Sequence, residues 1–118
     1  MEYTIKQVCQ KYGLNASTLR YYEKERLLPP IKKNSSNQRI YNEDDLKWLE
    51  IIMCMRKTGM TIAYIRNYVD LCKQGNQTLD KRYDILKKQK EILMLQLQEL
   101  NANIEMIDLK LEKFQNKL

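Results

Sequence analysis

The chain has 118 residues, of which 43% are hydrophobic and 31% charged, with only three glycines and two prolines. This composition is typical of a folded, helix-rich protein and excludes a disordered chain. The net charge is +6, and residues 1–42 carry most of it, with eight Lys or Arg against three Asp or Glu. Such clustering favours a polyanionic partner, such as nucleic acid, over a surface that is basic for solubility alone.

The sequence lacks the residues that several function classes require. It has no histidine and no CxxC pair, so we expect no metal site, no cofactor and no Ser-His-Asp or Cys-His catalytic group. No glycine-rich nucleotide-binding motif occurs. Without a run of about 18 apolar residues or a signal-peptide core, the chain is expected to be cytoplasmic and not membrane-bound. Three widely spaced cysteines also fit a reducing compartment.

The first third of the chain predicts a helix-turn-helix. Thr4 can cap a first helix that ends at Gly13. Asn15 can cap a second helix that runs to about Arg26, and the two prolines that follow end helical structure.

Residues 31–41 are predicted to form a β-hairpin, which would be the wing of a winged helix-turn-helix. Ile31 begins one short strand, and residues 39–41 form the other. The polar segment of residues 34–37 supplies the turn.

A pair of helices is predicted next. Asn42 caps the first of them, with Asp45 at the third helical position, and Gly59 ends it. Thr61 caps the second, which ends near Gly75. Residues 1–75 are therefore expected to form one domain: a winged helix-turn-helix with a helix pair.

Residues 76–118 are predicted to form a second domain, a single helix over about residues 79–117. Two apolar series with a seven-residue period run along it: Leu86, Leu93, Leu100, Ile107 and Phe114, and Leu97, Ile104, Leu111 and Leu118. This pattern predicts a coiled coil. The helix would be roughly 58 Å long, more than the rest of the chain could cover, so we expect a second copy as partner, in a homodimer. The heptads leave the helix direction open.

Several motifs resemble the N-terminal signature of the MerR family of bacterial regulators. In chain order they are Thr18–Glu23, Leu27–Pro30, Arg39–Tyr41, Asp45-Leu46, Met55-Arg56, Gly59 and Ile62. The resemblance covers residues 3 to about 70. It implies a mainly α fold: a winged helix-turn-helix, a linking helix pair and a long C-terminal helix that forms an antiparallel dimeric coiled coil. It also implies binding to a palindromic operator in promoter DNA, which the protein bends and untwists, and so an indirect action on RNA polymerase.

Candidate DNA-contacting residues lie on the second helix and the wing. On the helix they are Ala16, Ser17, Thr18, Arg20, Tyr21 and Tyr22. The small residues at the helix start can approach base edges, and Arg20 can pair with phosphate or guanine. The resemblance assigns Tyr21 and Tyr22 to DNA contact, although helical spacing also places Tyr22 with the core residue Leu19. It further assigns Arg39, Tyr41 and Arg56 to the DNA backbone.

Residues 45–50 and 54–56 resemble the aldehyde-responsive branch of the family, in which one cysteine of this helix is the proposed sensor. The resemblance implies that Cys54 reacts with an electrophilic small molecule such as formaldehyde, and the neighbouring Arg56 and Lys57 would raise the reactivity of a thiol. A buried, inert Cys54 is the alternative. The protein would then be an effector-independent repressor or an architectural DNA-binding protein.

Overall fold

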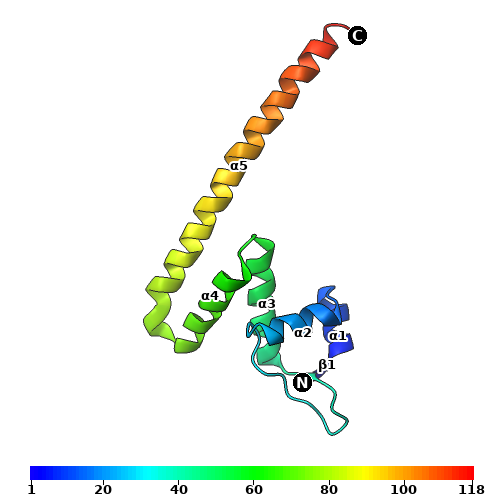
Figure 1. Cartoon of the computed structure of the whole chain (residues 1–118), viewed down its shortest axis with the longest axis vertical. Coiled ribbons are helices and arrows are strands. Elements are labelled where there is room, and N and C mark those ends of the chain that lie inside the picture. The colour runs from blue at the N-terminus through cyan, green and yellow to red at the C-terminus, as the bar shows by residue number, and fades with distance from the viewer. The chain divides into compact units, whose positions relative to one another are not determined.

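The computed structural model describes all residues 1–118 and divides the chain into two compact units, Met1–Thr78 and Leu79–Leu118. The N-terminal unit contains β1 (Tyr3–Thr4), α1 (Ile5–Tyr12), α2 (Ala16–Lys24), β2 (Ile40–Tyr41), α3 (Glu43–Lys57), α4 (Ile62–Gln74) and the 3-10 helix η1 (Asn76–Thr78). The second unit is one helix, α5 (Leu79–Gln115), drawn from yellow-green to red in Figure 1. The predicted mainly α fold, with a helix-turn-helix and a long C-terminal helix, is confirmed.

The helix-turn-helix begins and turns where the sequence predicted. The Thr4 hydroxyl accepts a hydrogen bond from the Gln7 amide, and the Gln7 side chain accepts one from the Thr4 amide, which completes a capping box. Gly13 ends α1 in the left-handed conformation, with φ of 66°. Asn15 precedes α2, but its side chain makes no capping hydrogen bond, so that part of the prediction was wrong.

The second helix ends at Lys24, two residues earlier than predicted. Arg26 has φ of 61° and reverses the chain direction. The Leu27 amide then donates to the Tyr22 carbonyl at 2.9 Å, which closes the end of α2 and carries Leu27 and Leu28 into the core. The left-handed residue, rather than the prolines, terminates this helix.

The wing is only partly a regular hairpin. Its turn forms as predicted, with the Asn37 amide donating to the Asn34 carbonyl at 3.0 Å. Its two arms meet at one isolated bridge, Lys33 with Arg39. The Ile40 amide donates to the Lys32 carbonyl at 2.8 Å, so the predicted pairing of the two arms is present. The returning strand β2 also pairs antiparallel with β1, placing Tyr41 opposite Tyr3, and the sequence prediction missed this second partner.

The helix pair follows the predicted caps closely. Asn42 and Asp45 form a reciprocal capping box at the start of α3. The Thr61 hydroxyl accepts from the Tyr64 amide at the start of α4, and Gly75 follows its end.

A single hydrophobic core holds the N-terminal unit together. Its most deeply buried side chains come from the four α-helices, from β2 and, for Leu27, from the segment after α2: Val8, Leu19, Leu27, Tyr41, Leu49, Ile52, Ile65 and Val69. Within this unit α2 packs against α1, and β2 packs against α1 and β1. The outer face of α2 remains exposed. In contrast, α5 has no buried residue. None of the helices combines the length and apolar composition that crossing a bilayer requires.

Candidate nucleic-acid interface

The exposed surface of α2 consists of polar, aromatic and basic side chains on one helical face. Ser17, Arg20, Tyr21 and Lys24 are exposed and recur at intervals of three and four residues, so they project from the same side of the helix. We call these four residues the α2 face. Lys24 was not among the predicted contacts, although its spacing from Arg20 could have revealed it. Ala16 and Thr18 are partly buried beside this face.

Two of the predicted DNA-contacting tyrosines lie in the core. Tyr22 is only 7% exposed and Tyr41 only 1%, whereas Tyr21 is 45% exposed. The Tyr41 hydroxyl is buried without a hydrogen-bond partner, and burial, with a smaller contribution from the charge of Glu23, raises the pKa of Tyr41 to about 12. The prediction that the side chains of Tyr22 and Tyr41 contact DNA is therefore corrected, because their packing keeps both rings from a duplex.

Arg39 connects the wing to α2. Its Nε donates to Glu23 Oε1 at 2.9 Å, and both side chains are partly buried. Since Glu23 lies near the end of α2, this ion pair ties the returning arm of the wing to the same helix that carries the α2 face.

Arg56 occupies a different place, in the last turn of α3. It is exposed, and its Nη1 donates to the Met60 carbonyl at 3.1 Å. The structure therefore brings Arg39 together with α2, whereas the hydrogen bond of Arg56 is to the segment between α3 and α4.

Cys54 lies on the surface of α3. It is exposed, although its neighbour Met55 is buried. An open groove of about 500 Å³ surrounds it, lined by Lys47, Glu50, Ile51, Cys54, Met55 and Tyr68. The alternative of a buried thiol is therefore excluded, and a small molecule in solution could reach the sulfur.

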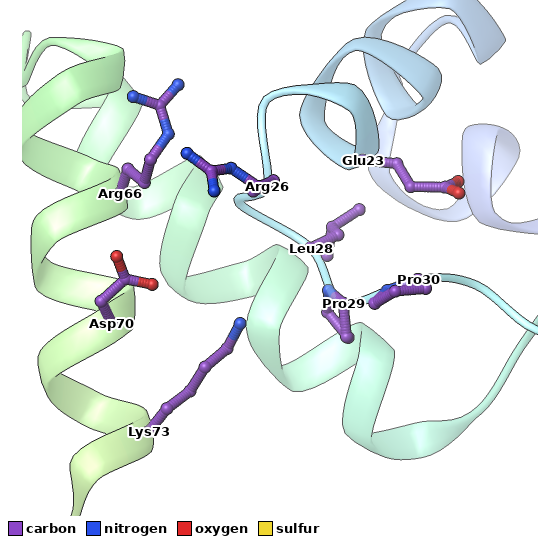
Figure 2. A pocket seen from close by; sticks show the side chains of 8 residues that line it. All are labelled: Glu23, Arg26, Leu28, Pro29, Pro30, Arg66, Asp70 and Lys73. Carbon is purple, nitrogen blue, oxygen red and sulfur yellow. The ribbon is translucent and has the colours of Figure 1, made fainter.

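A second depression, of about 310 Å³, lies beside the segment that follows α2 (Figure 2). Arg66 of α4 crosses to that segment, where its Nε donates to the Glu25 carbonyl at 2.7 Å and its Nη2 pairs with Glu25 Oε2 at 2.9 Å. Figure 2 places Arg26 and Lys73 near Asp70 at the same depression. Because its lining mixes both signs of charge, this depression is not a continuation of the basic α2 face.

The apolar heptad residues of α5 are all on the surface of the chain. The predicted dimer contacts Leu86, Leu93, Leu97, Leu100, Ile104, Ile107, Leu111 and Phe114, which we call the α5 seam, are between 37% and 65% exposed. Large apolar side chains in such a row are expected to be covered by another molecule.

Two family models match this chain. The model of the MerR HTH family regulatory proteins matches residues 3–72, and the model described as MerR, DNA binding matches residues 46–109. The chain belongs to the MerR family. It is therefore a helix-turn-helix transcription regulator rather than an enzyme, in agreement with the fold and with the exposed α2 face.

Individual MerR relatives agree with this assignment. The HTH-type transcriptional regulator AdhR of Bacillus subtilis is 42% identical over 90 residues, which are 76% of this chain and 64% of AdhR, so the chain spans just under two thirds of that relative. The structure of HiNmlR, a MerR family regulator lacking the sensor domain and bound to promoter DNA, has a TM-score of 0.80 and 30% identity, over 98% of this chain and 92% of that chain. A MerR family regulator from Bacillus thuringiensis has a TM-score of 0.78 and 36% identity, over 96% of this chain and 99% of that chain.

Proposed function

We propose that this MerR family chain works as a homodimer that binds a palindromic operator in promoter DNA and distorts the duplex, thereby controlling transcription by RNA polymerase. The α2 face would enter the major groove, where Ser17 and Arg20 would reach base edges or phosphates. Ala16, Thr18, Tyr21, Arg39 and Arg56 complete the proposed contact set. The promoter DNA bound by the similar regulator HiNmlR supports this assignment.

The exposed α5 seam is the main observation that supports the proposed homodimer. An isolated helix with this row of leucine, isoleucine and phenylalanine side chains would leave a long apolar surface in water. A second α5 covers it most simply, and the family resemblance favours an antiparallel pair. Two N-terminal units joined in this way, which we call the heads of the dimer, match a palindromic site, because the protein and the DNA then have the same two-fold symmetry.

Replacing Arg20 tests the DNA-binding surface. Arg20→Ala should weaken binding by roughly tenfold or more on both operator and unrelated duplexes, and lower the dependence of affinity on salt, because one phosphate or base contact per head is lost. Fluorescence anisotropy with a labelled duplex from the promoter of the chain's own gene measures both quantities. Lys113→Ala, which removes the same charge from the last turn of α5, is the matched control. Equal affinities for Arg20→Ala and the control would contradict the proposed role of the α2 face.

We further propose that electrophiles regulate the protein through Cys54. With formaldehyde, the thiol sulfur adds to the carbonyl carbon, the carbon–oxygen double bond becomes a single bond, and the thiol proton ends on the new hydroxyl. The exposed position of Cys54 in an open groove supports access of such a reagent. The adduct would add a polar group beside the apolar side chains of Ile51 and Met55, two residues before Arg56, and could thereby shift α3.

The Cys54→Ser variant tests this second proposal. A promoter reporter should lose formaldehyde induction in the Cys54→Ser strain and keep it in the Cys72→Ser strain, whose altered cysteine is only partly exposed. Mass spectrometry of the purified protein should find the adduct on Cys54. Full induction with Cys54→Ser would overturn the sensing role without affecting the proposed DNA binding.

A further inference from the structure

We propose that Glu23 is a positioning residue that holds Arg39 ready to bind a DNA phosphate, so that an acidic side chain on α2 increases affinity for a polyanion. This inference rests on the proposed DNA contact of Arg39. The observation behind it is the ion pair between Arg39 Nε of the wing and Glu23 Oε1 of α2, at 2.9 Å.

The geometry of the pair leaves the binding edge of Arg39 available. An arginine has five N–H donors, and Glu23 engages only the one on Nε. The four donors on the two Nη atoms make no other hydrogen bond or ion pair in the structure. A guanidinium can therefore bind a carboxylate with one edge and a phosphate with another, which a lysine ammonium cannot do in the same fixed plane.

Few backbone hydrogen bonds join the two arms of the wing. The arms share one isolated bridge, Lys33 with Arg39, whose hydrogen bonds run from the Ile40 amide to the Lys32 carbonyl at 2.8 Å and from the Asn34 amide to the Gln38 carbonyl at 2.9 Å. Glu23 belongs to α2, whose inner residues Leu19 and Tyr22 are buried. The ion pair thus joins the arginine of the wing to a helix that the core holds in place.

Two effects of Glu23 on DNA binding have opposite signs. Its negative charge repels phosphates, so its removal should strengthen binding if charge alone matters. Its hold on Arg39 reduces the side-chain freedom that DNA binding must otherwise remove, so its removal should weaken binding. Salt screens charges over about 8 Å under physiological conditions. It therefore weakens the repulsion between Glu23 and the phosphates more than the attraction between Glu23 and Arg39, whose atoms are in direct contact. We therefore expect positioning to exceed repulsion.

The chain contains a matched control for this comparison. Glu25 is two residues away, also at the end of α2, and also pairs with an arginine at 2.9 Å, but that arginine is Arg66 of α4. Glu23→Gln and Glu25→Gln remove the same charge and keep nearly the same shape. Only the first of these variants removes the ion pair that holds the arginine of the wing and leaves at most a weaker, neutral hydrogen bond.

The test is a double-mutant cycle with Glu23→Gln, Arg39→Ala and both together, alongside Glu25→Gln. Anisotropy is measured on a labelled promoter duplex and on a duplex of unrelated sequence, at several salt concentrations. Glu23→Gln should weaken binding to both duplexes by roughly 2- to 12-fold for each copy of the chain in the dimer, the usual cost of immobilising one long side chain. It should have no further effect when Arg39 is already alanine, and Glu25→Gln should not weaken binding.

Stronger binding by Glu23→Gln, an equal loss with Glu25→Gln, or a loss that persists in the Arg39→Ala background would each overturn positioning. Arg39→Ala with unchanged affinity would reject the proposed wing contact as well, which distinguishes the two failures. Thermal unfolding of each variant accompanies the binding data. Should Glu23→Gln not fold, Arg39→Lys replaces it: this variant keeps the charge but loses the planar fork, and wild-type affinity would then contradict the proposal.

Discussion

At the scale of single residues, burial decides which side chains of the helix-turn-helix can meet DNA. Tyr21 and Tyr22 are adjacent, yet one is exposed and the other packs in the core beside Leu19. Sequence motifs could not separate them, because a tyrosine suits both a core and a DNA backbone. Tyr41 is the most deeply buried of these tyrosines, and even its hydroxyl is buried without a hydrogen-bond partner.

The unpaired hydroxyl of Tyr41 predicts that Tyr41→Phe stabilises the protein. Burying a polar atom without a hydrogen bond costs roughly 1–3 kcal/mol, so its removal should raise the free energy of unfolding at pH 7 by about 1 kcal/mol. The pKa of Tyr41 is raised to about 12 from 10.0. Folding thus favours the neutral form of Tyr41. The resulting contribution to the free energy of unfolding is complete below pH 10 and is lost as the pH rises from 10 to 12. Tyr41→Phe should therefore flatten the decrease in stability over that range.

Urea denaturation at one fixed protein concentration measures both effects. Tyr64→Phe is the control, since Tyr64 is 63% exposed and the loss of its hydroxyl should change little. A destabilised Tyr41→Phe protein would mean that the hydroxyl is hydrogen-bonded after all.

At the scale of elements, local signals predicted the helices and the turn of the wing well, but not the pairing of β1 with β2. The capping boxes at Thr4 and Asn42 and the cap at Thr61 involve residues three apart, so the sequence contains each complete interaction. The pairing of β1 with β2 joins residues nearly forty positions apart in two strands of two residues each, too short to show any alternation. The ion pair of Glu23 with Arg39 also joins residues far apart in the sequence, and no sequence pattern predicts it.

The two asparagines that precede helices provide a prediction at this scale. Asn42→Ala should lower the free energy of unfolding by about 1 kcal/mol, because it removes the side chain that binds the Asp45 amide. Asn15→Ala should cost much less, since Asn15 makes no such bond. Thermal or urea unfolding of both variants, compared with the wild type, checks this difference. Equal losses would show that the capping hydrogen bond contributes little at α3.

At the scale of the whole molecule, the two units differ in where their apolar residues lie. The N-terminal unit buries its apolar residues within itself and exposes the α2 face, whereas α5 exposes its apolar seam along its whole length. The seven-residue period made that seam predictable from the sequence, but helix direction and partner are properties of an assembly and do not follow from heptads alone. A folded N-terminal unit and an exposed apolar seam on α5 agree with the proposed homodimer.

The most direct test of this account is the oligomeric state of a variant with a charge on the α5 seam. Leu100→Glu should raise the dissociation constant of the dimer by roughly 100-fold or more, because it removes a buried leucine and places a carboxylate in the interface of both chains. Gln98→Glu adds the same charge two residues away, off the seam, and should remain dimeric. Sedimentation velocity with and without the promoter duplex measures both. We predict a monomeric Leu100→Glu protein that has lost operator binding; a stable Leu100→Glu dimer, or a monomer that binds DNA like the wild type, would contradict the account.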